Sequence, residues 1–201
     1  MEEALFTWTD SPSTTLNVIW LVKEKDPTVF LWGKTDDQSP SSAKVARHSF
    51  YKGSKLEVCQ VQLTGLCPNK GYRVFLGDKE FRARTLPVKR SDRISFVTGG
   101  VMMHSPKFHE GGVKAMASRS PSFALLGGDL AYANRRSWER WLDWIGVYAD
   151  HAVCEDGYSI PFVVAIGNHE VNGGYGKTPK EAPMFYNFFP FPQKFEILLC
   201  D

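Results

Sequence analysis

The chain has 201 residues, of which 43% are hydrophobic and 23% are charged, the composition of an ordinary globular protein. Its formal net charge of +2 is too small to indicate a nucleic-acid-binding or membrane-surface protein. No stretch approaches the roughly 18 to 20 uninterrupted apolar residues of a membrane-spanning helix, so we expect no membrane span. The first residues, MEEALFTWTD, lack the basic start and apolar core of a signal peptide, and the compartment stays undetermined.

Residues 1–86 contain short strand-like runs separated by turn-forming residues. The runs are LNVIWLV (16–22), TVFLWG (28–33), KLEVCQVQL (55–63) and YRVFLG (72–77). Strands at this spacing predict a small antiparallel β-sandwich. In LTGLCPNKGYRVFL a Pro-containing turn precedes Tyr72, which resembles the tyrosine corner of fibronectin-type-III-like domains. The alternative is that Tyr72 is an ordinary aromatic residue of a strand.

The four cysteines are widely spaced and form no C-x-x-C motif, which argues against a zinc knuckle or a thioredoxin-type site. We expect four structural thiols, at positions Cys59, Cys67, Cys154 and Cys200. A disulfide between Cys59 and Cys67 across a hairpin is the alternative, and it requires an oxidising compartment.

A polar linker over residues 87–93 separates the sandwich from a second predicted domain, residues 94–201. Here the pattern changes to three apolar runs that each end in glycine: ISFVTGG (94–100), SFALLGG (122–128) and PFVVAIG (161–167). Helical segments are expected between them, in HEGGVKAMASRS (109–120) and RRSWERWLDWIGVYADHA (135–152). This order predicts an α/β domain with a parallel sheet buried on both faces.

Polar residues follow the second and third apolar runs, where the carboxyl ends of parallel strands form ligand sites. Asp129 follows the second run and is either a helix cap or a metal ligand. Asn168 and His169 follow the third run, about 39 residues later. An amide oxygen is a hard metal ligand, and a histidine is a ligand or an acid–base group near pH 7. Together they indicate a metal-assisted hydrolase.

The ordered pair GDLAY and GNHE resembles two motifs of the metallophosphoesterase superfamily, and the tyrosine of GDLAY resembles its purple acid phosphatase branch. The resemblance implies a fibronectin-III-like sandwich followed by an α/β metallophosphoesterase-type domain that is incomplete at the C-terminus. It implies a phosphate ester substrate and a dinuclear centre of Fe3+ with Zn2+, Mn2+ or Fe2+. By the same resemblance Asp129 would bridge the metals, Tyr132 would bind Fe3+, Asn168 would bind the divalent ion, and His169 would be a catalytic residue facing the phosphate. Members of this family are often secreted.

Val101 stands where the family places its first aspartate ligand, and valine has no donor atom. His104 would have to fold back to replace it, so we expect a histidine at the surface or behind the site. The downstream V-x-x-H and G-H-x-H motifs of the family do not occur before Asp201. We therefore expect an acid phosphatase by resemblance that lacks its metals and activity in this chain. The alternative is a non-catalytic pseudophosphatase or binding protein, and a purely structural adhesive protein ranks last.

Three further segments carry expectations. The aromatic stretch APMFYNFFPFPQ (182–193) is either a lid over the site or a packing segment. NGGYGK (172–177) is a Gly-rich loop without the Lys-Ser/Thr ending of a P-loop. KFEILLCD (194–201) is expected to form a further buried strand. The exposed edge of the parallel sheet is a candidate surface for a partner or a second copy of the chain.

Overall fold

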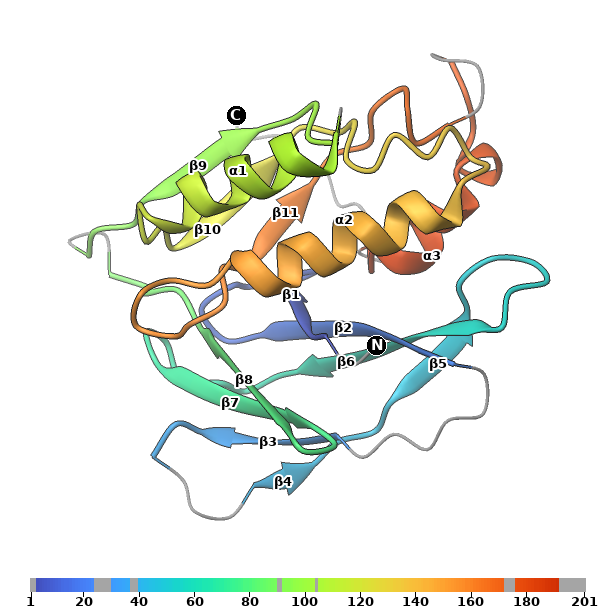
Figure 1. Ribbon diagram of the computed structural model, residues 1–201. Helices are drawn as coiled ribbons and strands as arrows, with labels where there is room; N and C mark the ends of the chain where they lie inside the picture. Colours follow the sequence, from blue (N-terminus) through green and yellow to red (C-terminus); the bar gives the residue numbers. More distant parts are fainter. Residues whose placement is uncertain are drawn as a thin grey trace, which may run out of the picture.

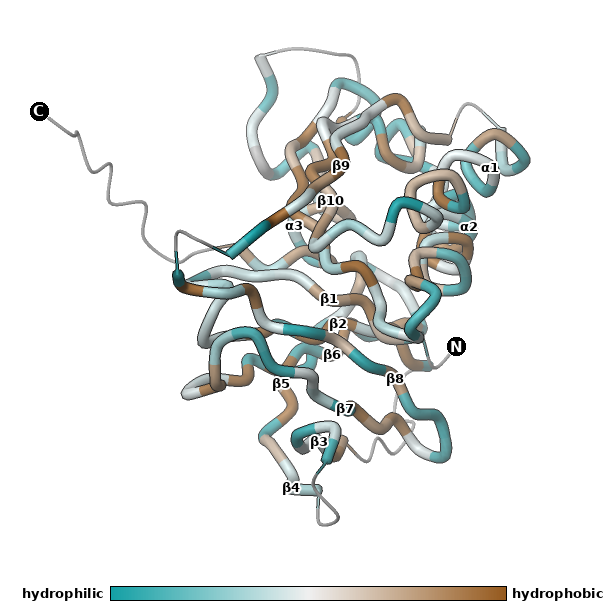
Figure 2. The backbone as a smooth tube through the Cα atoms, turned by 90° about the vertical axis from the view of Figure 1, so that its left-hand side faces the viewer, coloured by the Kyte–Doolittle hydropathy of each residue, from teal (hydrophilic) through white to brown (hydrophobic). Residues whose placement is uncertain are grey.

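The computed structural model describes residues 3–23, 30–36, 40–89, 92–103, 105–171 and 176–191. His104, Cys200, most of the Gly-rich loop and the strand expected over 194–201 lie outside the described residues. Figure 1 shows the arrangement: a β-sandwich at the bottom, with two long helices and a small parallel sheet above it. Figure 2 shows the same two layers from the side.

The predicted antiparallel sandwich is confirmed. Its first sheet has the order β1-β2-β6-β5, formed by Leu5–Thr7, Leu16–Lys23, Leu56–Leu63 and Ala46–Ser49. Its second sheet has the order β4-β3-β7-β8, formed by Ser41–Ser42, Phe30–Lys34, Gly71–Leu76 and Lys79–Arg84. Alternate residues of β7 point into the core between the sheets, where the rings of Trp20 and Phe30 stack 5.5 Å apart.

The tyrosine corner is also confirmed. The Tyr72 side chain is buried, and its hydroxyl oxygen accepts a hydrogen bond of 2.7 Å from the backbone N–H of Cys67, five residues earlier. No disulfide joins Cys59, which is buried in β6, to Cys67, which is exposed. The corner therefore closes this turn through a hydrogen bond.

The second unit has the expected order of strand, helix, strand, helix and strand. Its elements are β9 (Phe96–Gly99), α1 (Pro106–Ala117), β10 (Phe123–Leu126), α2 (Trp138–His151) and β11 (Phe162–Val164). The three strands are parallel in the order β11-β10-β9. A short 3-10 helix (Pro179–Glu181) and α3 (Pro183–Phe188) follow. Within the described residues, none of the helices has the length and apolar character needed to cross a membrane.

The expectation that both faces of the parallel sheet are buried is wrong for the described part of the chain. One face, with Ala124 and Leu126, is covered by α1 and α2 and belongs to the core. The opposite face leaves Phe96 55%, Leu125 41% and Val163 38% exposed. Both helices lie on the same face because each crossover between neighbouring parallel strands turns in the same direction.

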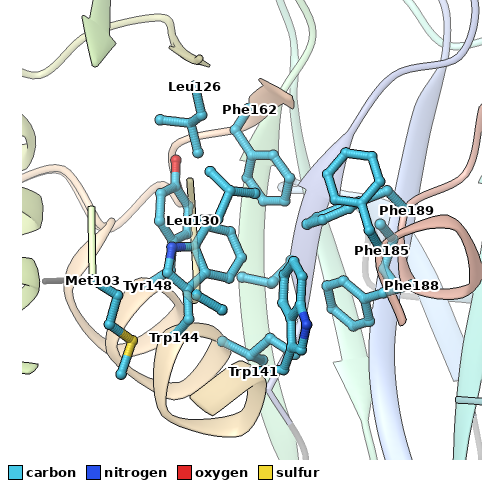
Figure 3. Close-up of a cluster of buried hydrophobic side chains, with 14 of the residues drawn as sticks. Met103, Leu126, Leu130, Trp141, Trp144, Tyr148, Phe162, Phe185, Phe188 and Phe189 are labelled. Carbon is cyan, nitrogen blue, oxygen red and sulfur yellow. The ribbon is translucent and has the colours of Figure 1, made fainter. Parts of the chain in front are cut away.

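The aromatic stretch predicted as either a lid or a packing segment packs into the core (Figure 3). Phe188 meets Phe50 of the sandwich with ring centroids 6.1 Å apart, and Phe189 meets Trp141 of α2 at 5.9 Å. Both phenylalanines are buried, as is Phe185. α3 therefore fills the space between α2 and the first sheet of the sandwich, and it is no lid.

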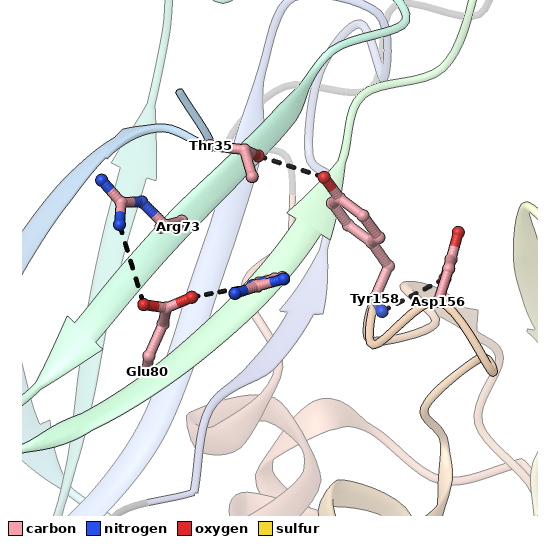
Figure 4. Close-up of polar contacts among 6 residues, drawn as sticks. Thr35, Arg73, Glu80, Asp156 and Tyr158 are labelled. Atoms are coloured by element: carbon pink, nitrogen blue, oxygen red, sulfur yellow. Dashed lines mark hydrogen bonds and ion pairs between the residues drawn. The ribbon is translucent and has the colours of Figure 1, made fainter. Parts of the chain in front are cut away.

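A second contact joins the two layers beside the loop that follows α2 (Figure 4). The hydroxyl of Tyr158 lies 3.1 Å from Thr35 Oγ1 at the end of β3. Arg84 of β8 donates to Asp156 Oδ2 at 3.0 Å, and its guanidinium lies 3.9 Å from the centre of the Tyr158 ring. The sandwich thus holds the α/β unit through an aromatic core on one side and a polar contact on the other.

Candidate active site at the strand ends

The loops after β9, β10 and β11 meet at the carboxyl end of the parallel sheet. Their close approach depends on glycine, because a Cβ atom on Gly128 would lie 2.5 Å from the backbone nitrogen of Gly167. Gly128 also has a φ of +89°, which side chains rarely adopt. The glycine endings of the apolar runs therefore allow the two loops to pack against each other.

Asp129 lies at the centre of these loops and is held by residues from each of them. Its backbone N–H donates to Glu170 Oε2 at 2.8 Å, and its carbonyl oxygen accepts from Met102 N at 2.9 Å. Its side-chain Oδ1 accepts from the backbone N–H of His169 at 3.0 Å. Asp129 has a φ of 52°, a left-handed conformation that aspartate tolerates better than most residues. Asp129 is thus a fixed bridge between strands β10 and β11 and not a helix cap.

His169 is oriented by two neighbours of the β10 loop. Its Nδ1 atom lies 2.8 Å from Asn134 Oδ1, and the backbone N–H of Asn134 donates to the His169 carbonyl oxygen at 2.9 Å. Because an amide oxygen only accepts, a hydrogen on Nδ1 suits this arrangement, and Nε2 is the ring nitrogen left for other partners. The Tyr132 ring stacks on the imidazole with centroids 4.2 Å apart.

Tyr132 is half-buried, and its surroundings are negative. Burial, followed by the charges of Asp129 and Glu170, raises the pKa of the phenol. A phenolate at this position therefore requires a compensating positive charge nearby. The ferric ion implied by the resemblance would supply such a charge. Asn168 is half-buried in the loop that follows β11, between Gly167 and His169. The structure brings Asp129, Tyr132 and His169 into contact, and Asn168 is the residue next to His169 in the chain.

Val101 lies at the end of β9, next to the same loops. Its backbone N–H donates to the Gly128 carbonyl at 3.1 Å, and its side chain is 62% exposed. Its φ is 56°, a conformation in which a β-branched residue is strained. The backbone at this position therefore suits aspartate, asparagine or glycine better than valine.

The residues that the structure describes at these strand ends do not fit a dinuclear metal centre by themselves. Among the described residues, no group of three or more His, Cys, Asp or Glu side chains is placed to hold a metal ion. Asp129 already accepts a backbone hydrogen bond through Oδ1, and Val101 contributes no donor atom. Two cations need more ligands than Asp129, Tyr132 and Asn168 provide.

Sequence reasoning missed three residues of this site. Asn134 could have been found, because it lies five residues after Asp129 in the same loop. Glu170 is the last residue of GNHE, but the sequence does not show that its side chain is buried. Arg140 of α2 donates to the carbonyl of Ala131 at 2.8 Å and to that of Met103 at 2.6 Å. The sequence does not predict these bonds, because charged residues on amphipathic helices are usually exposed to solvent.

The structure thus places Asp129 and His169 at the carboxyl ends of neighbouring parallel strands, where open α/β sheets bind ligands. Residues 2–98 match the family model described as purple acid phosphatase, N-terminal domain. Residues 2–98 are therefore similar to a purple acid phosphatase N-terminal domain, which agrees with the antiparallel sandwich that they form. No curated protein matches the chain.

Proposed function

We propose that the chain is a purple-acid-phosphatase-like protein whose site is shaped for a phosphate monoester but does not hydrolyse it as the chain stands. The contact that carries this proposal is the one between Asp129 Oδ1 and the backbone of His169, which joins the two strand-end motifs. The match of residues 2–98 to the purple acid phosphatase N-terminal domain supports the same relationship. The missing activity is inferred from Val101, which offers no ligand.

His169 would serve the phosphate side of the site. With Nδ1–H directed to Asn134, its Nε2 atom is the one left to face a substrate. In the neutral form Nε2 accepts a hydrogen bond, and in the protonated form it donates one to a phosphate oxygen or to a leaving alcohol. Asp129, Tyr132 and Asn168 are the residues of this chain that would hold a cation next to that phosphate.

Metal content and phosphatase activity of the purified chain test the proposal together. After dialysis against metal-free buffer, plasma mass spectrometry should find close to no iron, zinc or manganese, and hydrolysis of p-nitrophenyl phosphate should stay at background. Val101→Asp should increase the metal content, whereas Val88→Asp, at an exposed valine remote from the strand ends, should not. About two metals per unmodified chain, with activity, would mean that other groups complete the site and that the chain is an enzyme.

A second candidate function is a non-catalytic binding protein, and the open face of the parallel sheet favours it. Parallel sheets are normally covered on both faces, yet Phe96, Leu125 and Val163 are exposed here. Sedimentation velocity would reveal self-association through this face, and Leu125→Glu should abolish it. A monomer at all concentrations, with or without the substitution, argues against self-association.

A further inference from the structure

Glu170 is the most completely buried carboxylate near the strand ends, and no role follows for it from the proposed hydrolysis. Its side chain is only 2% exposed and carries no arginine or lysine partner among the contacts described for it. Its two oxygens accept three backbone N–H groups. Oε2 accepts from Asp129 at 2.8 Å and from Gly167 at 2.7 Å, and Oε1 accepts from Leu130 at 2.8 Å.

These three donors come from different strand ends. Asp129 and Leu130 follow β10, whereas Gly167 follows β11, so one carboxylate joins both loops. The loops would otherwise present three backbone N–H groups to a region from which water is largely excluded, which is costly. Burial raises the pKa of the Glu170 carboxyl, whereas the bonds from Gly167, Leu130 and Asp129 lower it and favour the ionised form.

We propose that Glu170 is a positioning residue that holds Asp129 and His169 in register across strands β10 and β11. It acts through the backbone: it fixes the N–H of Asp129, and the Asp129 carboxylate in turn receives the N–H of His169. Asp129, whose N–H makes the first of these bonds, has a left-handed φ of 52°. The inference rests on the proposed function only in taking Asp129 and His169 as site residues.

The arrangement of the donors makes a specific prediction for Glu170→Gln. A glutamine of the same shape has one accepting oxygen and one donating NH2 group. It can keep the bonds of Asp129 and Gly167, or the bond of Leu130, but not all three. Asp129 and Gly167 share Oε2, so their amides should respond together and opposite to Leu130.

Hydrogen exchange of these amides, resolved by NMR on the chain without added metal or substrate, tests the inference. In Glu170→Gln we expect at least tenfold faster exchange at Leu130, or at both Asp129 and Gly167, after correction for global stability. The imidazole 15N signals of His169 should shift as well, since a role limited to overall stability would leave them unchanged in the folded protein. Glu155→Gln, at an exposed glutamate, is the matched control and should change each rate less than twofold.

Two outcomes would overturn the inference. The first is a folded Glu170→Gln protein in which all three amides exchange at the original rates. The second is loss of protection with unchanged His169 signals, which would leave Glu170 a purely structural residue. If Glu170→Gln does not fold, Glu170→Asp keeps both oxygens on a shorter side chain and is read by the same criteria. Because metal content and activity play no part here, this inference and the proposed function can fail separately.

Discussion

Nδ1 of His169 lies 2.8 Å from Oδ1 of Asn134, and this contact determines which ring nitrogen faces outward. We expect Asn134→Gly to release the ring, because glycine tolerates the φ of 46° at this position and has no side-chain acceptor. Nitrogen-15 NMR of the neutral imidazole should show the Nδ1–H tautomer in the original chain and a substantial Nε2–H population in the variant. An unchanged tautomer would show that the stacking of Tyr132 alone orients His169.

Replacing Val101 should stabilise the fold. Val101→Asn removes a β-branched side chain from a left-handed conformation, a strain of about 1 kcal/mol or more. We expect the free energy of unfolding in urea to rise by about 1 kcal/mol. Val88→Asn, at another exposed valine whose φ is negative, should bring no such gain. Equal effects of the two substitutions would contradict the strain argument.

Arg140 of α2 should stabilise the loops that follow β9 and β10, because it donates hydrogen bonds to a carbonyl of each. Arg140→Met keeps most of the hydrocarbon stem but loses the bonds to the carbonyls of Ala131 and Met103. Hydrogen bonds from a charged donor contribute about 1.5–3 kcal/mol, so urea unfolding should show a loss of roughly that size. Arg136→Met, at an exposed arginine, serves as the control. A loss below that of the control would mean that water replaces these bonds.

Acid should destabilise the packing of α1 against α2 through His109. The side chain is buried against Trp144, and burial lowers its pKa below the ordinary value. His151 lowers it further, while the hydrogen bond to the Trp144 carbonyl partly opposes the shift. Below a pH of about 6.5, His109 is protonated in the unfolded chain but stays neutral in the folded one. The free energy of unfolding therefore falls as the pH drops below about 6.5.

Urea unfolding between pH 7.5 and 5 measures this effect. The difference between the original chain and His109→Phe should grow toward acid, by at most about 1.4 kcal/mol per pH unit. Phenylalanine keeps a flat ring against Trp144 but does not titrate. Parallel pH curves for the two proteins would show that His109 is not the group responsible.

Short-range patterns explain how much of the fold was predictable. The alternation of β7 and the turn before Tyr72 specify the sandwich, and the glycine-ended runs specify parallel strands. Asp129 and His169 were found because residues at the ends of adjacent parallel strands meet. Asn134, Glu170 and Arg140 act through backbone atoms of distant loops, and such contacts leave no pattern in residue type. The open face of the sheet was missed because apolar strands look the same whether one face or both are covered.

The position of α3 has a consequence for how this chain can be divided. Phe188 and Phe189 fill the seam between Phe50 of the sandwich and Trp141 of α2, so the first 86 residues supply one wall of the core of the α/β unit. Each part would expose that seam to water if produced alone. If the sandwich is exchanged between relatives, by recombination or by engineering, we therefore expect that Phe188 of α3 and the adjacent Phe189 must be exchanged with it.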